Sequence, residues 1–319
     1  MKKTKNVTIL VTVLNKVDTI KNCIESLLKV KYPYKRILIV DGHSSDGTYE
    51  ILQKYENKID LFQFSINHSS RLNWALDQID TEFVALTDGD CVVDPHWLNE
   101  LMKGFKEKGV VATSGYCGTP RELSLLQDLI GLELENRFKK FPQYISRAPT
   151  MNLCMKTAIA RKVRFDKKQI VGIETDFGYR LTKFGKMVYS PKAKVFHYHR
   201  ASLKNYFNQQ KNQAMGGVRI FSKHGRKALA DHITTLKMTL QIPLFFLSLV
   251  FLLLSFTNQI FLFLLVLMIV GLLIIYLKII SEISPSRKLY LPFLGLFFFR
   301  TFAWAVGILK GIILLFTKA

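Results

Sequence analysis

The stretch from residue 238 to residue 277 constrains the fold most, because none of its forty side chains is charged. About 20 helical residues cross the hydrocarbon core of a bilayer, so this stretch is roughly twice the length that one crossing needs. Thr257, Asn258 and Gln259 interrupt it near the middle. We expect two membrane-spanning helices, at residues 238–256 and 260–278, joined by a tight turn. A buried hairpin in a soluble protein is the alternative, and the length of the uncharged run disfavours it.

A third apolar segment, residues 289–316, contains Arg300 and Lys310. It fits either a third membrane span or an interfacial helix whose cations snorkel to the headgroups. Gly307 and Gly311 have the GxxxG spacing, which permits close helix packing.

The loop before this segment carries Arg287 and Lys288, whereas the turn near residue 258 has no basic residue. The positive-inside rule therefore predicts an integral membrane protein whose N-terminal domain is cytoplasmic.

The chain is strongly basic, with a formal net charge of +21. Between Lys183 and Lys237 there are twelve Lys or Arg residues and one acidic residue, Asp231. A basic segment directly before a membrane span favours contact with anionic lipids. Nucleic acid is the competing partner, but no pattern of a nucleic-acid-binding module accompanies the charge. We therefore predict membrane lipids, and not nucleic acid, as the partner of residues 183–237.

The first 230 residues alternate between apolar, β-branched runs and segments with helical spacing of apolar residues. This alternation predicts an α/β domain with a mostly parallel sheet covered by helices on both faces. The predicted strands are residues 7–14, 36–40, 59–64 and 83–87, and the predicted helices are residues 19–28, 48–55, 71–79 and 97–108.

Polar clusters follow three of the predicted strands: Asn15, residues 41–46, and residues 88–90. Ligands of parallel sheets bind beyond the carboxyl ends of the strands, so these clusters predict a functional edge. Asp88 and Asp90 flank a glycine directly after a strand, where both carboxylates can face one cation, and hard oxygen ligands suit Mn²⁺ or Mg²⁺. An ordinary turn rich in Asp and Gly is the competing explanation.

The segment DGHSSDGT at residues 41–48 is more specific, because it follows a strand and precedes a helix. Helix capping accounts for Ser45 and Asp46 but does not explain an aspartate, Asp41, at the end of a buried strand. With this motif the chain resembles the inverting family 2 glycosyltransferases, which have the GT-A fold. The resemblance covers about residues 6–200. It includes VTILVTVLNKVDTIKNCIESLL from Val7, SSRLNWAL from Ser69, TEFVALTDGDCVVDPHWL from Thr81 and GIETDFGYRLTKFGKMVYSPKAKVFHYH from Gly172.

The resemblance implies a role for individual residues. Those expected at the nucleotide are Asn15, Asp41, Arg71, Asn73 and Asp88. Asp88 and Asp90 would form the metal-binding pair, and His197 would contact the metal or the diphosphate. The catalytic base would be Glu174 or Asp176, because the usual pair of adjacent acids is here Ile173-Glu174.

The expected activity is inverting, metal-dependent transfer of a sugar from a UDP- or GDP-sugar donor. The position before a membrane suggests a lipid-linked acceptor, such as a polyprenyl or dolichyl phosphate or a glycan built on one. The Q-x-x-R-W signature of the family's processive polysaccharide synthases is absent after Gln209, which favours non-processive transfer. A sugar-phosphate nucleotidyltransferase is disfavoured because the loop from Asn15 to Asp18 lacks glycine. A non-catalytic nucleotide-binding membrane scaffold is the remaining alternative.

We therefore expect a GT-A domain over residues 1–230, a transmembrane hairpin at 238–278 and a third transmembrane or interfacial helix at 289–316.

Overall fold

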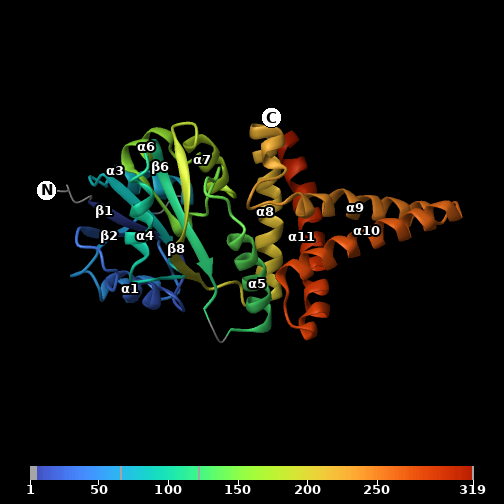
Figure 1. Cartoon of the computed structure of the whole chain (residues 1–319), viewed down its shortest axis with the longest axis horizontal. Coiled ribbons are helices and arrows are strands. Elements are labelled where there is room, and N and C mark those ends of the chain that lie inside the picture. The colour runs from blue at the N-terminus through green and yellow to red at the C-terminus, as the bar shows by residue number, and fades with distance from the viewer. Residues whose placement is uncertain (1–5, 65–66, 121–122, 318–319) are drawn as a thin grey trace. The chain divides into compact units, whose positions relative to one another are not determined.

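The computed structural model describes residues 6–64, 67–120 and 123–317 (Figure 1). The described chain divides into two compact units. The sheet unit holds the residues up to 120 and residues 138–198, and the helical unit holds residues 123–137 and 199–317. The expectation that residues 1–230 act as one functional domain remains a prediction.

The sheet unit is built on one mixed sheet with the strand order β3-β2-β1-β4-β7-β6-β8-β5. The first four strands in the chain pair in parallel, as their βα alternation predicts. Beyond them β7 and β5 pair antiparallel with their neighbours, so the sheet is mixed rather than parallel throughout. The strands are β1 (Val7–Val13), β2 (Lys35–Asp41), β3 (Asp60–Gln63), β4 (Phe83–Asp88), β5 (Cys91–Val93), β6 (Val110–Gly118), β7 (Leu153–Lys156) and β8 (Lys186–His197).

The helices of the sheet unit bury the apolar faces that the sequence spacing indicates. In α1, for example, Ile20, Cys23, Ile24 and Leu27 are completely buried, as expected for apolar residues spaced along one helical face. The four predicted helices are present with ends shifted by a few residues. The helices are α1 (Ile20–Leu28), α2 (Thr48–Gln53), α3 (His68–Asp77), α4 (Trp97–Gly104), α6 (Thr157–Val163) and α7 (Ile173–Leu181), with a 3₁₀ turn at Thr150–Asn152.

The strand register brings the predicted polar clusters to one edge of the sheet. On β1, Val13 pairs with Asp41 of β2, and Thr12 pairs with Asp88 of β4. The carboxyl ends of three parallel strands are therefore level, and the loops that follow them lie next to one another. The sheet thus provides the shared edge at which ligands of such folds bind.

The helical unit contains α5 (Leu125–Lys139, with its last two residues in the sheet unit), α8 (Leu203–His224), α9 (Leu236–Leu254), α10 (Gln259–Ile283) and α11 (Tyr290–Thr317). Short 3₁₀ turns lie at Gly225–Ala228 and Arg287–Leu289. Three helical segments, residues 236–254, 259–283 and 287–317, are long and apolar enough to cross a membrane. Within this unit α8 and α11 run alongside each other, and the α9–α10 hairpin projects crosswise from them (Figure 1).

Two features of the helical unit differ from the sequence-based expectations. The sequence did not indicate α5, which lies between β6 and β7 along the chain yet packs among the C-terminal helices. If residues 289–316 formed an interfacial helix, Arg300 was expected to snorkel to the headgroups, but the structure gives it a partner within the helical unit. Its side chain is 2% exposed, and its guanidinium donates to both carboxylate oxygens of Glu133 on α5. The partner of Arg300 is therefore the carboxylate of Glu133 and not a lipid headgroup.

Candidate active site

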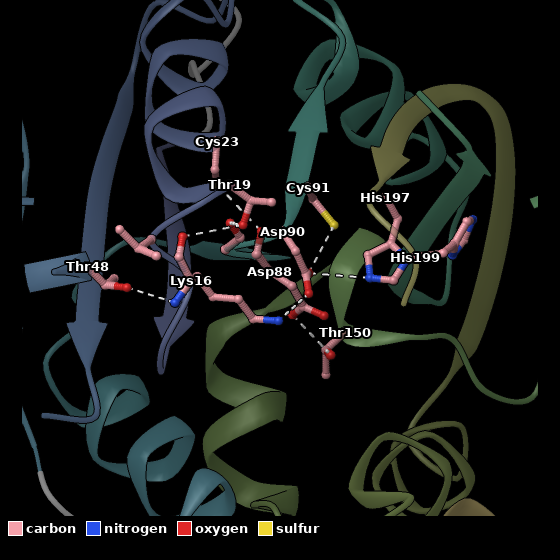
Figure 2. A network of polar contacts seen from close by, with 12 residues as sticks. Lys16, Thr19, Cys23, Thr48, Asp88, Asp90, Cys91, Thr150, His197 and His199 are labelled. Carbon is pink, nitrogen blue, oxygen red and sulfur yellow. Dashed lines mark hydrogen bonds and ion pairs between the residues drawn. The ribbon is translucent and has the colours of Figure 1, made fainter. Parts of the chain in front are cut away.

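The turn Asp88-Gly89-Asp90 connects β4, in the middle of the sheet, to β5 at its edge (Figure 2). The antiparallel pairing of β5 with β8 sets Cys91 opposite His197. As a result, Nε2 of His197 lies 3.3 Å from Oδ1 of Asp90. The structure therefore brings together Asp90 and His197, two of the three residues that the resemblance assigned to a metal. The third, Asp88, ends β4 at the start of the same turn, and the charges of Asp90 and His197 act on it. Strand β8 ends at His197.

Lys16 is a member of this cluster that the sequence analysis missed. Its Nζ lies 2.5 Å from Oδ2 of Asp90, and its side chain is 22% exposed. The Lys16 ammonium therefore contacts Oδ2 of the Asp90 carboxylate, and the His197 imidazole approaches Oδ1 (Figure 2). Its position directly after Asn15, in the loop that follows β1, could have indicated that Lys16 lies at the functional edge of the sheet.

The two aspartates have opposite electrostatic environments. Burial and the charge of Asp90 raise the pKa of Asp88 to about 7, and Glu174 acts in the same direction. Burial alone would also raise the pKa of Asp90, but His197 and Lys16 lower it well below its ordinary value. His197 and Lys16 lower the pKa of both aspartates, but only for Asp90 do they outweigh the effect of burial.

The donor set fits a divalent cation. Ligand atoms of Asp90, Cys91 and His197 all lie within 4.8 Å of one another, and the Asp88 carboxylate follows β4 in the same turn. The carboxylate oxygens among these groups suit Mn²⁺ or Mg²⁺. Burial raises the pKa of the Cys91 thiol, so this residue stays protonated and is a poor ligand. An added cation would also relieve the repulsion that raises the Asp88 pKa.

The loop at residues 41–48 is held by its own polar side chains. The buried carboxylate of Asp41 accepts hydrogen bonds from the backbone and hydroxyl of Ser44 and from Nε2 of Gln63. Asn15, in the left-handed backbone region at φ 51°, accepts from the backbone of Ser45. These contacts connect the loops after β1 and β2. They show how Asp41 and Asn15 shape the edge, and the predicted contacts with a nucleotide remain predictions.

Arg71 and Asn73 both lie on α3 but have different surroundings. Nη1 of Arg71 donates to the carbonyl of Val13 at 2.7 Å and crosses so close to Gly42 that a Cβ there would lie 1.8 Å from it. Glycine at position 42 thus gives the guanidinium access to the strand edge. The Asn73 amide instead donates to and accepts from the backbone of Phe165, each at 2.8 Å. That amide is engaged in the fold, and its role at a nucleotide stays a prediction.

The two candidate bases lie on the first turn of α7 and differ sharply. Asp176 is 1% exposed and accepts from Nε and Nη2 of Arg180 at 2.9 and 2.6 Å. Glu174 is only partly buried, and its charge acts on Asp88. Asp176 is therefore held in an ion pair with Arg180, whereas the charge of Glu174 acts on Asp88.

A mixed sheet with an acidic turn at the carboxyl ends of its parallel strands is the arrangement of a GT-A glycosyltransferase. The chain aligns with the mannosyltransferase PcManGT from Pyrobaculum calidifontis in complex with GDP-Man and Mn²⁺. The TM-score is 0.62 at 16% identity, over 97% of this chain and 88% of that one. A second structure, GalNAc-T7 with UDP, GalNAc and Mn²⁺, aligns with a TM-score of 0.51 at 13% identity, over 74% of this chain and 55% of that one. At these identities the structures establish the fold.

The family model for glycosyl transferase family 2 matches residues 8–168, and the chain belongs to this family. Among characterised relatives, hyaluronan synthase of Streptococcus pyogenes is 24% identical over 258 residues, which cover 73% of this chain and 62% of that protein. Poly-beta-1,6-N-acetyl-D-glucosamine synthase of Staphylococcus aureus is 24% identical over 261 residues, covering 76% of this chain and 60% of that protein. The matches thus span less than two thirds of either relative. Family membership favours a glycosyltransferase over a sugar-phosphate nucleotidyltransferase.

Proposed function

We propose that the protein transfers a sugar from a nucleoside diphosphate sugar to a lipid-linked acceptor at the cytoplasmic face of a membrane, with inversion and with a divalent cation. The observation that carries this proposal is the acidic turn Asp88–Asp90 at the carboxyl edge of the sheet, where Lys16 and His197 contact Asp90. Glu174, in the first turn of α7, adds a carboxylate whose charge acts on Asp88. Such a transfer requires carboxylates that bind the metal and a further carboxylate that acts as the general base.

Glu174 is proposed as the base. In an inverting transfer a carboxylate takes the proton from the acceptor hydroxyl as that oxygen attacks the anomeric carbon. The transition state has oxocarbenium character, as in glycoside hydrolysis. Glu174 is only partly buried and acts electrostatically on Asp88, whereas Arg180 occupies the Asp176 carboxylate. We therefore propose Asp176 as the residue that fixes the start of α7 and so positions Glu174.

Asp88, Asp90 and His197 would hold the divalent cation. When bound, such an ion neutralises the charge that develops on a departing diphosphate. The fold relative PcManGT was determined with GDP-Man and Mn²⁺, and GalNAc-T7 with UDP and Mn²⁺. These complexes support a divalent cation here and keep both nucleotides as candidates. Asp41, Arg71 and Asn15 line the adjoining edge and are proposed to bind the nucleotide.

The acceptor is proposed to reside in the membrane. Three segments are long and apolar enough to span a bilayer, and the basic stretch 183–237 precedes them in the chain. A polyprenyl- or dolichyl-linked acceptor would reach an active site held near the headgroups without leaving the bilayer.

Polymer synthesis is a second candidate, because the relatives at 24% identity are named as hyaluronan and poly-N-acetylglucosamine synthases. The missing Arg-Trp after Gln209 supports single additions instead. The size of the product separates the two: one added sugar supports the first proposal, and a ladder of lengths supports the second.

The test is nucleoside diphosphate release by the detergent-purified full chain, given a panel of UDP- and GDP-sugars, Mn²⁺ and a membrane lipid extract. Asp90→Asn is the diagnostic variant. Asp80→Asn, at an aspartate whose side chain is 86% exposed, is the matched control. We expect release with one donor that requires Mn²⁺ and lipid, is lost in Asp90→Asn and is retained in Asp80→Asn. Nucleotide binding without release from any donor would favour the non-catalytic scaffold.

A further inference from the structure

The contact between Lys16 and Asp90 is part of a built arrangement rather than a chance surface pair. The backbone N–H of Lys16 donates to Oγ1 of Thr48 at 2.7 Å, and the hydroxyl of Thr19 donates to the carbonyl of Gly89 at 3.0 Å. The loop after β1 is thereby fixed both to the start of α2 and to the aspartate turn. An added Cβ on Gly89 would lie 3.5 Å from Cγ of Lys16, so the lysine stem passes directly over that turn.

This placement puts a positive charge where the proposed cation must interact. The ammonium of Lys16 lies 2.5 Å from Oδ2 of Asp90, and the Asp90 side chain is 9% exposed. Interactions between charges strengthen as water is excluded, so two cations on one largely buried carboxylate repel each other appreciably. A divalent ion that binds Asp90, at Oδ2 or at the Oδ1 that faces His197, therefore competes with the ammonium for the charge of one carboxylate.

The displaced ammonium has one evident partner in the proposed reaction. In the proposed reaction the diphosphate of a donor would bind next to the cation that the aspartates would hold. Lysine carries a compact charge on a flexible stem with three donors, which lets it follow a phosphate oxygen over a few ångströms. The pinned backbone at Thr48 and Thr19 keeps the side chain within reach of the turn while its end moves.

We propose that Lys16 is an internal counter-ion. Its ammonium pairs with Asp90 until metal and donor bind, and the side chain then moves so that the ammonium pairs with the donor diphosphate. This inference rests on the proposed function. Without nucleotide, metal binding is weak because the Lys16 ammonium competes for Asp90. With nucleotide, metal binding is strong because the ammonium contacts the diphosphate instead. Reciprocal coupling between the two ligands follows from linkage.

The test compares Lys16→Met, which keeps the length of the side chain without its charge, with Lys16→Arg, which keeps the charge. Lys21→Met on the exposed face of α1 controls for the loss of one positive charge from a basic protein. Electron paramagnetic resonance measures Mn²⁺ binding to the full chain without nucleotide. Calorimetry then measures binding of UDP and GDP at saturating Mn²⁺.

We expect Lys16→Met to bind Mn²⁺ alone roughly threefold to tenfold more tightly, and the nucleotide in the presence of Mn²⁺ weaker by a similar factor. Lys16→Arg and Lys21→Met should stay near wild type in both measurements. Unchanged or weaker Mn²⁺ binding in Lys16→Met would overturn the counter-ion role, and unchanged nucleotide binding would overturn the transfer to the diphosphate. If wild type binds neither Mn²⁺ nor nucleotide, the proposed function itself fails and this inference with it.

Discussion

At the scale of single residues, α7 presents two acids with separate tasks. Asp176 is buried against Arg180, and breaking a buried ion pair by removing one partner costs about 3–5 kcal/mol; the guanidinium side chain is 28% exposed, which reduces the cost to about 2–3 kcal/mol here. Glu174 is partly exposed and acts on Asp88. The consequences of replacing each acid should therefore differ in kind.

We expect Glu174→Gln to leave the thermal unfolding midpoint within about 2 °C of wild type and to lower the rate of nucleotide release by about 10²–10⁴-fold. Asp176→Asn should instead lower the midpoint by several degrees. Differential scanning fluorimetry and the release assay measure the two effects, with Glu56→Gln at an exposed glutamate as the control. Full activity in Glu174→Gln would remove that residue from the role of base.

At the scale of elements, glycines set the distance between α8 and α11. A Cβ at Gly307 would lie 2.1 Å from the backbone oxygen of Lys211, and one at Gly311 would lie 2.9 Å from that of Met215. The close packing expected from the GxxxG spacing is therefore present, and it lies between two helices of the same chain. Gly295, on the same helix α11, has open space around it.

Gly307→Ala should destabilise the protein by about 1–3 kcal/mol, because a methyl group against backbone forces the helices apart. Gly295→Ala is the matched control and should be neutral or stabilising by about 0.5–1 kcal/mol, since alanine is the better helix former. Thermal unfolding in detergent measures both. Equal midpoints for the two variants would show that the close approach does not matter to stability.

The elements that could be predicted from sequence are those whose signal is local. The β-branched runs that end at Asp41 and Asp88 carry their own burial pattern, and the uncharged run from residue 238 defines two helices by length alone. Helix α5 was missed because its apolar residues are interleaved with charged ones, and its ion-pair partner Arg300 is 167 residues from Glu133. Lys16 was missed for the same reason, since 74 residues separate it from Asp90.

At the scale of the whole molecule, the Glu133–Arg300 pair connects a segment from the middle of the chain to the last helix. Burial would raise the pKa of Glu133, but the charges of Arg300 and Arg137 lower it below its ordinary value. A carboxylate whose folded pKa is depressed contributes stability above its unfolded pKa, near 4.3, and loses it as the pH falls through the folded value. The contribution is therefore complete at neutral pH.

We expect Glu133→Gln to destabilise the protein at pH 7 by about 3–5 kcal/mol, because it leaves a buried guanidinium without its counter-charge. The double variant Glu133→Met with Arg300→Met should recover most of that loss. The difference between wild type and Glu133→Gln should shrink as the pH falls below about 4.3. Midpoints measured from pH 7 to pH 3 test this, and a difference that grows on acidification would contradict it.

The packing of α11 also predicts on which side of the membrane this helix ends. Helix α8 carries Lys204, Lys211, Arg219 and Lys223, and such a helix belongs at the membrane interface rather than in hydrocarbon. Because α11 packs along α8 through Gly307 and Gly311, we propose that it lies at the same depth and that only the α9–α10 hairpin spans. The C-terminus would then lie on the cytoplasmic side.

Reporter fusions test this arrangement in a bacterial host. A fluorescent reporter that folds only in the cytoplasm should be active after Ala319, and alkaline phosphatase should be active when inserted at Asn258 in the α9–α10 turn. Phosphatase activity at the C-terminus would instead mean that α11 is a third span.

The central claim is that the edge formed by Asp88, Asp90 and Glu174 transfers a sugar to a membrane acceptor. The most direct measurement uses a donor carrying a radiolabelled sugar, with the purified chain, Mn²⁺ and a lipid extract, and follows both released nucleotide and label in the organic phase. We predict equal amounts of the two in wild type and neither in Asp90→Asn or Glu174→Gln. Nucleotide release with the label recovered only as free sugar, or transfer that persists in both variants, would contradict the account.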